Sequence, residues 1–125
     1  METMKTPKLM LLIVATLFQL SLLAQAPQKF SYQAVVKNAS NNLVTNHAVG
    51  LKLSILNASS TVVYSETQTP VTNANGLISV EVGSGTAISG TMAGIAWSSS
   101  TYTLKSEIDP AGGTTYSITG TSSLL

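Results

Sequence analysis

Apolar and polar residues alternate along much of the chain, which is the pattern of a β-strand with one buried face. From Phe30 to Val36 every second residue is apolar, while Ser31 and Gln33 between them are polar. Successive side chains of a strand point to opposite faces, so a period of two gives one apolar face. Residues 30–37 are therefore predicted to form a half-buried strand.

Further segments alternate in the same way or are rich in β-branched residues, and turn-forming residues separate them. The Asn75-Gly76 pair is the clearest turn, because Asn-Gly is favoured where a tight reversal needs positive φ. Pro70 ends the segment before it, since proline gives a ladder no amide donor. We predict the further strands at residues 49–55, 61–68, 77–82, 102–108 and 114–119, with turns at 38–42, 57–60, 72–76 and 109–113.

The stretch 87–97 is built mainly of small residues and is predicted to be a crossing loop with one helical turn. Its bulky side chains, Met92, Ile95 and Trp97, are expected to plug one end of the core. Six or seven short strands spaced by about ten residues predict an all-β fold, a single antiparallel β-sandwich of about seven strands. A closed barrel is the alternative, but one apolar and one polar face per strand favours two packed sheets.

The first part of the chain is predicted to lie outside this domain. Lys5 and Lys8 precede an apolar run over residues 9–23, and Ala24-Gln25-Ala26 supplies the small residues of a cleavage site. The run is shorter than the about 20 residues that a bilayer span needs. We predict a helical signal peptide at 1–26, cut after Ala26 or, because Pro27 disfavours that bond, after Ala24. The β-sandwich domain then covers 27–125 and is secreted or on the cell surface, with no membrane span after cleavage.

The net charge of the predicted domain excludes one class of binding partner. Residues 27–125 contain four lysines, four acidic residues and no arginine, so this part has no net charge. Nucleic acid is not an expected partner, because binding it requires a basic surface. The chain has no cysteine, so its stability must come from packing without disulfides.

The residues that could carry chemistry are few. His47 is the only histidine of the chain and is expected to be exposed in a loop, without a catalytic partner. Glu107 and Asp109 share one side of a strand, so a shared cation or an acid/base pair is conceivable. The simpler interpretation is that Asp109 opens a turn and Glu107 pairs with a lysine. We therefore predict no catalytic residue, no metal and no cofactor; a hydrolase would require His47 to approach Glu107 or Asp109.

Tyrosines offer one candidate binding surface. Most large aromatic residues are needed for a core of this size, but Tyr64 and Tyr102 are candidates to face a ligand, as an exposed platform for a sugar.

Residues 30–38, Phe-Ser-Tyr-Gln-Ala-Val-Val-Lys-Asn, stand just after a leader that ends in Ala-Gln, and this arrangement resembles the N-terminal domain of a large family of secreted Bacteroidota proteins. The resemblance implies a β-sandwich between a signal peptide and a longer distal region, with no enzymatic residues to carry over. Relatives run on past the final Leu-Leu pair, so we expect the sequence to be a fragment. The topology is also loosely similar to transthyretin-like and carboxypeptidase-regulatory sandwiches, which implies no activity. The resemblance extends over residues 43–46, 65–69, 72–77, 97, 109–116 and 120–125.

Two functions are expected from these observations. The first is a non-enzymatic structural or interaction module of an exported bacterial protein, whose partner is a distal region or another protein chain. The alternative is a carbohydrate-binding module that uses exposed aromatic residues, with a glycan as its partner.

Overall fold

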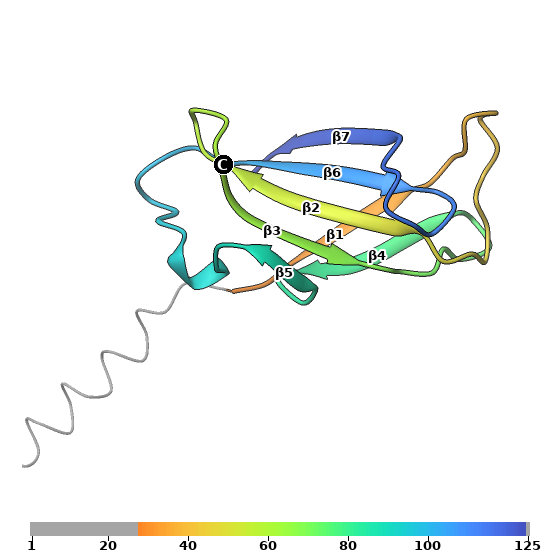
Figure 1. Ribbon diagram of the computed structural model, residues 1–125, viewed down its shortest axis with the longest axis horizontal. Coiled ribbons are helices and arrows are strands. Elements are labelled where there is room, and N and C mark those ends of the chain that lie inside the picture. Colours follow the sequence, from red (N-terminus) through yellow and green to blue (C-terminus); the bar gives the residue numbers. More distant parts are fainter. Residues whose placement is uncertain (1–27, 125) are drawn as a thin grey trace, which may run out of the picture.

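The computed structural model describes residues 28–124, and this part of the chain has an all-β fold. Its seven strands form two antiparallel sheets, with strand orders β1-β4 and β5-β3-β2-β6-β7 (Figure 1). Two sheets packed in this way make a small β-sandwich, which confirms the predicted fold class over the closed barrel. The strands are β1 (Phe30–Val35), β2 (Gly50–Leu56), β3 (Val62–Gln68), β4 (Leu77–Val82), β5 (Thr86–Ser89), β6 (Thr103–Asp109) and β7 (Ile118–Ser123).

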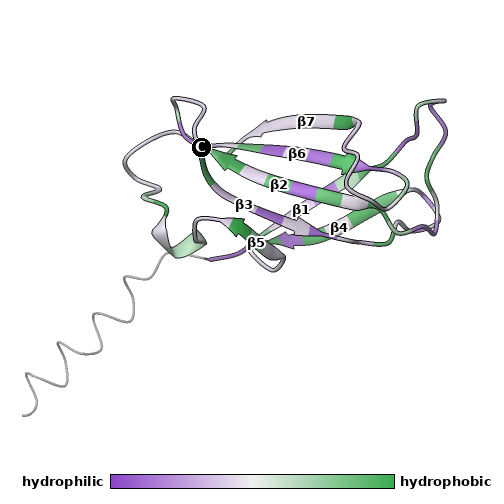
Figure 2. Ribbon diagram, in the orientation of Figure 1, coloured by the Kyte–Doolittle hydropathy of each residue, from purple (hydrophilic) through white to green (hydrophobic). Residues whose placement is uncertain are grey.

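The core is centred on β2, which lies in the middle of the five-stranded sheet between β3 and β6. Leu51, Leu53 and Ile55 of β2 are at most 1% exposed. Burying one such side chain contributes about 1.5–3 kcal/mol relative to leaving it in water. Figure 2 shows that hydrophobic and hydrophilic residues are interleaved along β2 and β6. On β1, half-buried and exposed residues alternate as the sequence predicts.

Three loops have the same conformation, a repeat that the sequence analysis does not reveal. They span residues 38–42, 57–61 and 73–77, and each begins with an asparagine whose side-chain oxygen accepts from the amides two and four residues ahead. The fourth residue of each loop has positive φ: Asn41 (63°), Ser60 (61°) and Gly76 (74°). Asparagine initiates such turns because its short side chain replaces a backbone acceptor.

The Asn75-Gly76 turn is therefore longer than a two-residue reversal. Only Gly76 of the pair has positive φ, and Asn73 holds the loop through its bonds to the amides of Asn75 and Leu77. β4 begins directly after Gly76, as predicted.

Two segments differ from the prediction. The crossing loop at 87–97 contains most of β5 at its start, which the sequence did not indicate because all four residues of β5 are exposed and show no alternation. The predicted helical turn is present as the 3₁₀ helix η2 (Met92–Gly94), and Met92 and Ile95 are both buried. The last strand is Ile118–Ser123 instead of 114–119, so Gly120 lies inside β7 and does not end it.

The predicted signal peptide at 1–26 lies outside the described residues. Within residues 28–124, no helix is long and apolar enough to cross a membrane.

Candidate interaction site

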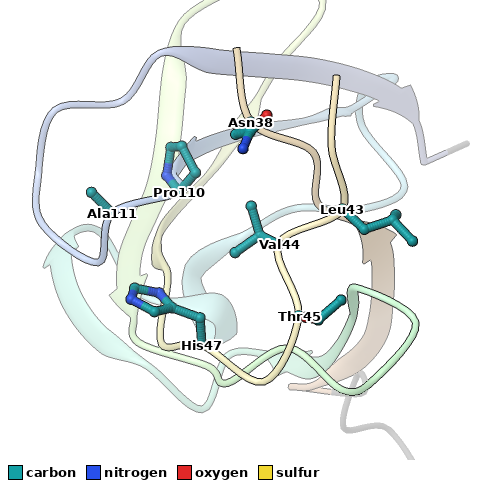
Figure 3. Close-up of a pocket in the computed structure, with 7 residues that line it drawn as sticks. All are labelled: Asn38, Leu43, Val44, Thr45, His47, Pro110 and Ala111. Atoms are coloured by element: carbon teal, nitrogen blue, oxygen red, sulfur yellow. The ribbon is translucent and has the colours of Figure 1, made fainter. Parts of the chain in front are cut away.

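A shallow hollow of about 480 Å³ lies at one end of the sandwich, between the β1–β2 loop and the β6–β7 loop. Figure 3 shows Val44 near its middle, with Pro110 and His47 on one side and Leu43 on the other. Leu43 is 47% exposed, so an apolar side chain stands at the rim in solvent. The lining residues are Asn38, Leu43, Val44, Thr45, His47, Pro110 and Ala111.

The first part of the β1–β2 loop is fixed by backbone bonds next to the end of β1. The amide of Val44 donates to the carbonyl of Val36 at 2.9 Å, and Lys37 and Leu43 form an isolated antiparallel bridge. These contacts fold the loop back on the end of β1, which places Val44 over the end of the core.

His47 is held by its backbone, while its side chain is exposed. The Thr72 hydroxyl oxygen accepts from the His47 amide at 3.1 Å, and the Thr72 amide donates to the His47 carbonyl at 3.0 Å. Thr72 is only 2% exposed, so this anchor is rigid. The imidazole lies on the surface beside Pro110 and Ala111, as the prediction of an exposed loop histidine requires (Figure 3).

Asp109 organises the other wall of the hollow. Its two carboxylate oxygens accept from the amides of Ala111 at 2.9 Å and Thr115 at 3.0 Å. Asp109 is 6% exposed, whereas Ala111 and Thr115, whose amides it binds, are exposed. The predicted turn opener is confirmed, and its carboxylate holds its own loop.

Glu107 has a different partner from Asp109. The Lys105 ammonium lies 3.7 Å from a Glu107 oxygen, which is the lysine pairing that the simpler interpretation predicts. Among the described residues, no three His, Cys, Asp or Glu side chains lie close enough together to hold a metal ion. Neither acidic side chain forms a hydrogen bond with His47 in this part of the chain.

The expectation of exposed tyrosines is wrong for both candidates. Tyr64 is 4% exposed and Tyr102 is 6% exposed. The Tyr102 hydroxyl donates to the Ala96 carbonyl at 2.9 Å, and its ring packs edge-on against Trp97. Burial, with a smaller contribution from the nearby Glu66 charge, raises the pKa of Tyr64 above its ordinary value. Both rings belong to the hydrophobic core, Tyr64 from β3 and Tyr102 from the residue just before β6.

Glu66 is a buried group that the sequence analysis missed. It lies on β3 with 0% exposure and accepts hydrogen bonds from the amides of Gly83 and Gly85. The Gln68 side-chain amide donates to the same carboxylate at 3.1 Å. The two glycines form the connection between β4 of the small sheet and β5 of the large sheet. Glu66 therefore ties the two sheets together at the point where the chain crosses, and its role is structural.

Residues 31–121 match the sequence profile of a family described as a domain of unknown function (DUF8740), and the chain belongs to this family. No curated protein and no solved structure matches the chain.

Proposed function

We propose that this domain is a non-enzymatic structural or interaction module of an exported bacterial protein, which binds a distal region or another protein chain. The observation that carries the proposal is the position of the hollow. It lies at the end of the sandwich opposite the end at which both described chain ends are found (Figure 1). A domain that is attached through one end leaves its opposite end free for a partner.

The end at which both described chain ends lie is held by a cluster of aromatic rings. Trp97 packs edge-on against Phe30, at the start of β1, with ring centroids 6.4 Å apart. Its ring also lies 5.2 Å from that of Tyr102, and the Tyr102 carbonyl accepts from the Leu124 amide at 2.9 Å. Each such aromatic pair contributes about 0.5–1.5 kcal/mol beyond its buried area.

The free end has the character of a protein contact surface. Val44 lies near the middle of the hollow, and around it lie two further apolar side chains, Leu43 and Pro110, and two polar ones, Asn38 and His47 (Figure 3). A surface of this kind, in which exposed apolar side chains stand beside polar ones, is typical of protein interfaces.

The residues that line the hollow do not form a pair of a nucleophile and a general base. Asp109 uses both oxygens on backbone amides, and Glu107 pairs with Lys105. The carbohydrate alternative has no observation in its favour, because Tyr64 and Tyr102 are buried.

Export is the part of the proposal that rests on the leader at 1–26. The test is to express the chain with its own N-terminus in a bacterial host and to measure the mass of the product outside the cytoplasm. We expect a chain that begins at Gln25 or Pro27. An uncut chain retained in the cytoplasm would overturn the proposal.

The contact surface is tested by two matched substitutions of exposed apolar residues. Leu43→Asp places a charge at the hollow, and Val62→Asp, at a residue 48% exposed, places the same charge on β3 away from it. After chemical cross-linking of intact cells, we expect a discrete adduct that Leu43→Asp abolishes and Val62→Asp retains. Equal adducts in both variants would show that the hollow is not the contact surface.

A further inference from the structure

The described part of the chain has four strands with a free edge, and three of these edges carry a feature that prevents pairing with another chain. Exposed edge strands tend to pair, and natural proteins block them with shortness, irregularity, charge or a covering segment. β5 is only four residues long, and its register with β3 shifts between Ser65 and Glu66. The edge of β4 is partly covered, because the Gln68 side chain donates to the Glu81 carbonyl at 2.8 Å.

The edge of β1 is blocked by charge against a second copy of itself. The Val36 amide donates to Gly76, so by alternation Ser31, Gln33 and Val35 direct their backbone groups away from β4. If two β1 strands paired antiparallel about Gln33, Lys29 of each copy would stand opposite Lys37 of the other. Like charges directly opposite each other destabilise a strand pair.

β7 has none of these features. It is six residues long, it pairs with β6 in unbroken register, and residues 117–124 contain no charged residue and no proline. The Leu124 amide donates to Tyr102, so by alternation Thr119, Thr121 and Ser123 direct their amides and carbonyls away from β6. No other strand of the described chain pairs with this side of β7.

We propose that β7 is a self-association edge, at which two copies of this chain pair antiparallel about a two-fold axis at Thr121. In this register Thr121 faces its own copy, and Thr119 of each chain faces Ser123 of the other. The three pairs exchange about six backbone hydrogen bonds. Their side chains all lie on the exposed face, where Thr–Thr and Thr–Ser pairs stabilise neighbouring strands.

The lack of charge along the β7 edge favours a second copy of this chain as its partner. The nearest charged residues, Lys105 and Glu107 on β6, already pair with each other, so the edge presents a neutral surface to an identical edge. A two-fold contact uses the same patch on both subunits and closes after two copies. The paired strands bury an area at the small end of specific interfaces, so we expect weak association with a dissociation constant on the order of 0.1 mM.

The test is sedimentation of the purified protein over a series of concentrations. We expect the wild type to form a dimer, and Thr121→Lys and Thr121→Glu each to weaken dimerisation at least about tenfold, because like charges then face each other. An equimolar mixture of the two variants should restore dimers at low salt and lose them at high salt. Thr86→Lys makes the same substitution on the edge of β5 and should associate like the wild type.

Each alternative result would overturn this inference. A wild type that stays monomeric at the highest concentration, or a Thr121→Lys variant that dimerises like the wild type, would show that β7 does not pair. Failure of the mixture to restore dimers would overturn the register centred on Thr121. These outcomes are separate from those of the Leu43→Asp experiment, because β7 contributes no residue to the hollow.

Discussion

Two buried carboxylates hold glycine-containing loops in this domain, and they differ in the distance along the chain to the amides that they bind. Asp109 binds the amides two and six residues ahead, within its own loop. Glu66 binds amides 17 and 19 residues ahead, at the crossing between the two sheets. Both accept two backbone amides, but Asp109 shapes a local loop at the surface, whereas Glu66 joins two separate parts of the fold. The comparison suggests that the long-range contact stabilises the whole domain and the local contact mainly its loop.

The largest expected effect comes from removing each charge while keeping the shape of the side chain. Glu66→Gln places an amide donor against the donors of Gly83 and Gly85, in a site with no exposure. We expect a loss of about 3–5 kcal/mol, because breaking a buried charged contact leaves its partners unsatisfied. Urea unfolding followed by circular dichroism measures this loss.

Asp109→Asn is the matched control for that substitution. Ala111 and Thr115 are exposed, so an amide that loses the carboxylate can bind water instead. We expect a loss of about 1 kcal/mol. If Glu66→Gln and Asp109→Asn lose equal stability, the distinction between the two carboxylates is wrong.

The second expected effect comes from adding one methyl group beside each carboxylate. A Cβ at Gly85 would lie 2.1 Å from a Glu66 oxygen and 2.5 Å from the Thr67 carbonyl. A Cβ at Gly113 would lie 2.9 Å from an Asp109 oxygen, in an exposed loop that can shift. We expect Gly85→Ala to cost about 1–3 kcal/mol by overpacking, and Gly113→Ala to cost less than 1 kcal/mol. Thermal unfolding of the two variants tests the order, and a larger loss for Gly113→Ala would contradict it.

The same difference between local and distant partners explains how far the sequence predicts this fold. Alternation located β1, β2, β4 and β6, and the Asp109 turn followed from its own Pro-x-Gly-Gly neighbours. The last strand begins later than predicted because Asp109 also binds the Thr115 amide, which holds residues 110–115 in the loop. A contact six residues ahead leaves no periodic signal.

The hollow could be predicted only in part for the same reason. The exposure of His47 followed from its polar neighbours, but its anchor, Thr72, lies 25 residues further along the chain. Pro110 and Ala111 come from a loop that only the pairing of β6 with β2 brings near His47. Tyr64 and Tyr102 illustrate the opposite error, because a tyrosine at a core position is buried whatever surface its ring could offer.

The smallest expected effect comes from a substitution in the loop 57–61, whose hydrogen bonds all join residues close in sequence. Ser60 occupies, in the loop 57–61, the positive-φ position that Gly76 occupies in the loop 73–77. A residue with a Cβ is strained by roughly 1 kcal/mol in this conformation, whereas glycine is not. Ser60→Gly should therefore stabilise the domain by about 0.5 kcal/mol, since greater freedom of glycine in the unfolded chain offsets part of the gain. The converse substitution, Gly76→Ser, should destabilise by more than the strain alone, because its Cβ would lie 3.1 Å from Leu43 and 3.3 Å from the Val36 carbonyl. Chemical unfolding of both variants measures the two effects, and a loss of stability in Ser60→Gly would mean that the Ser60 side chain contributes more to this loop than its backbone strain costs.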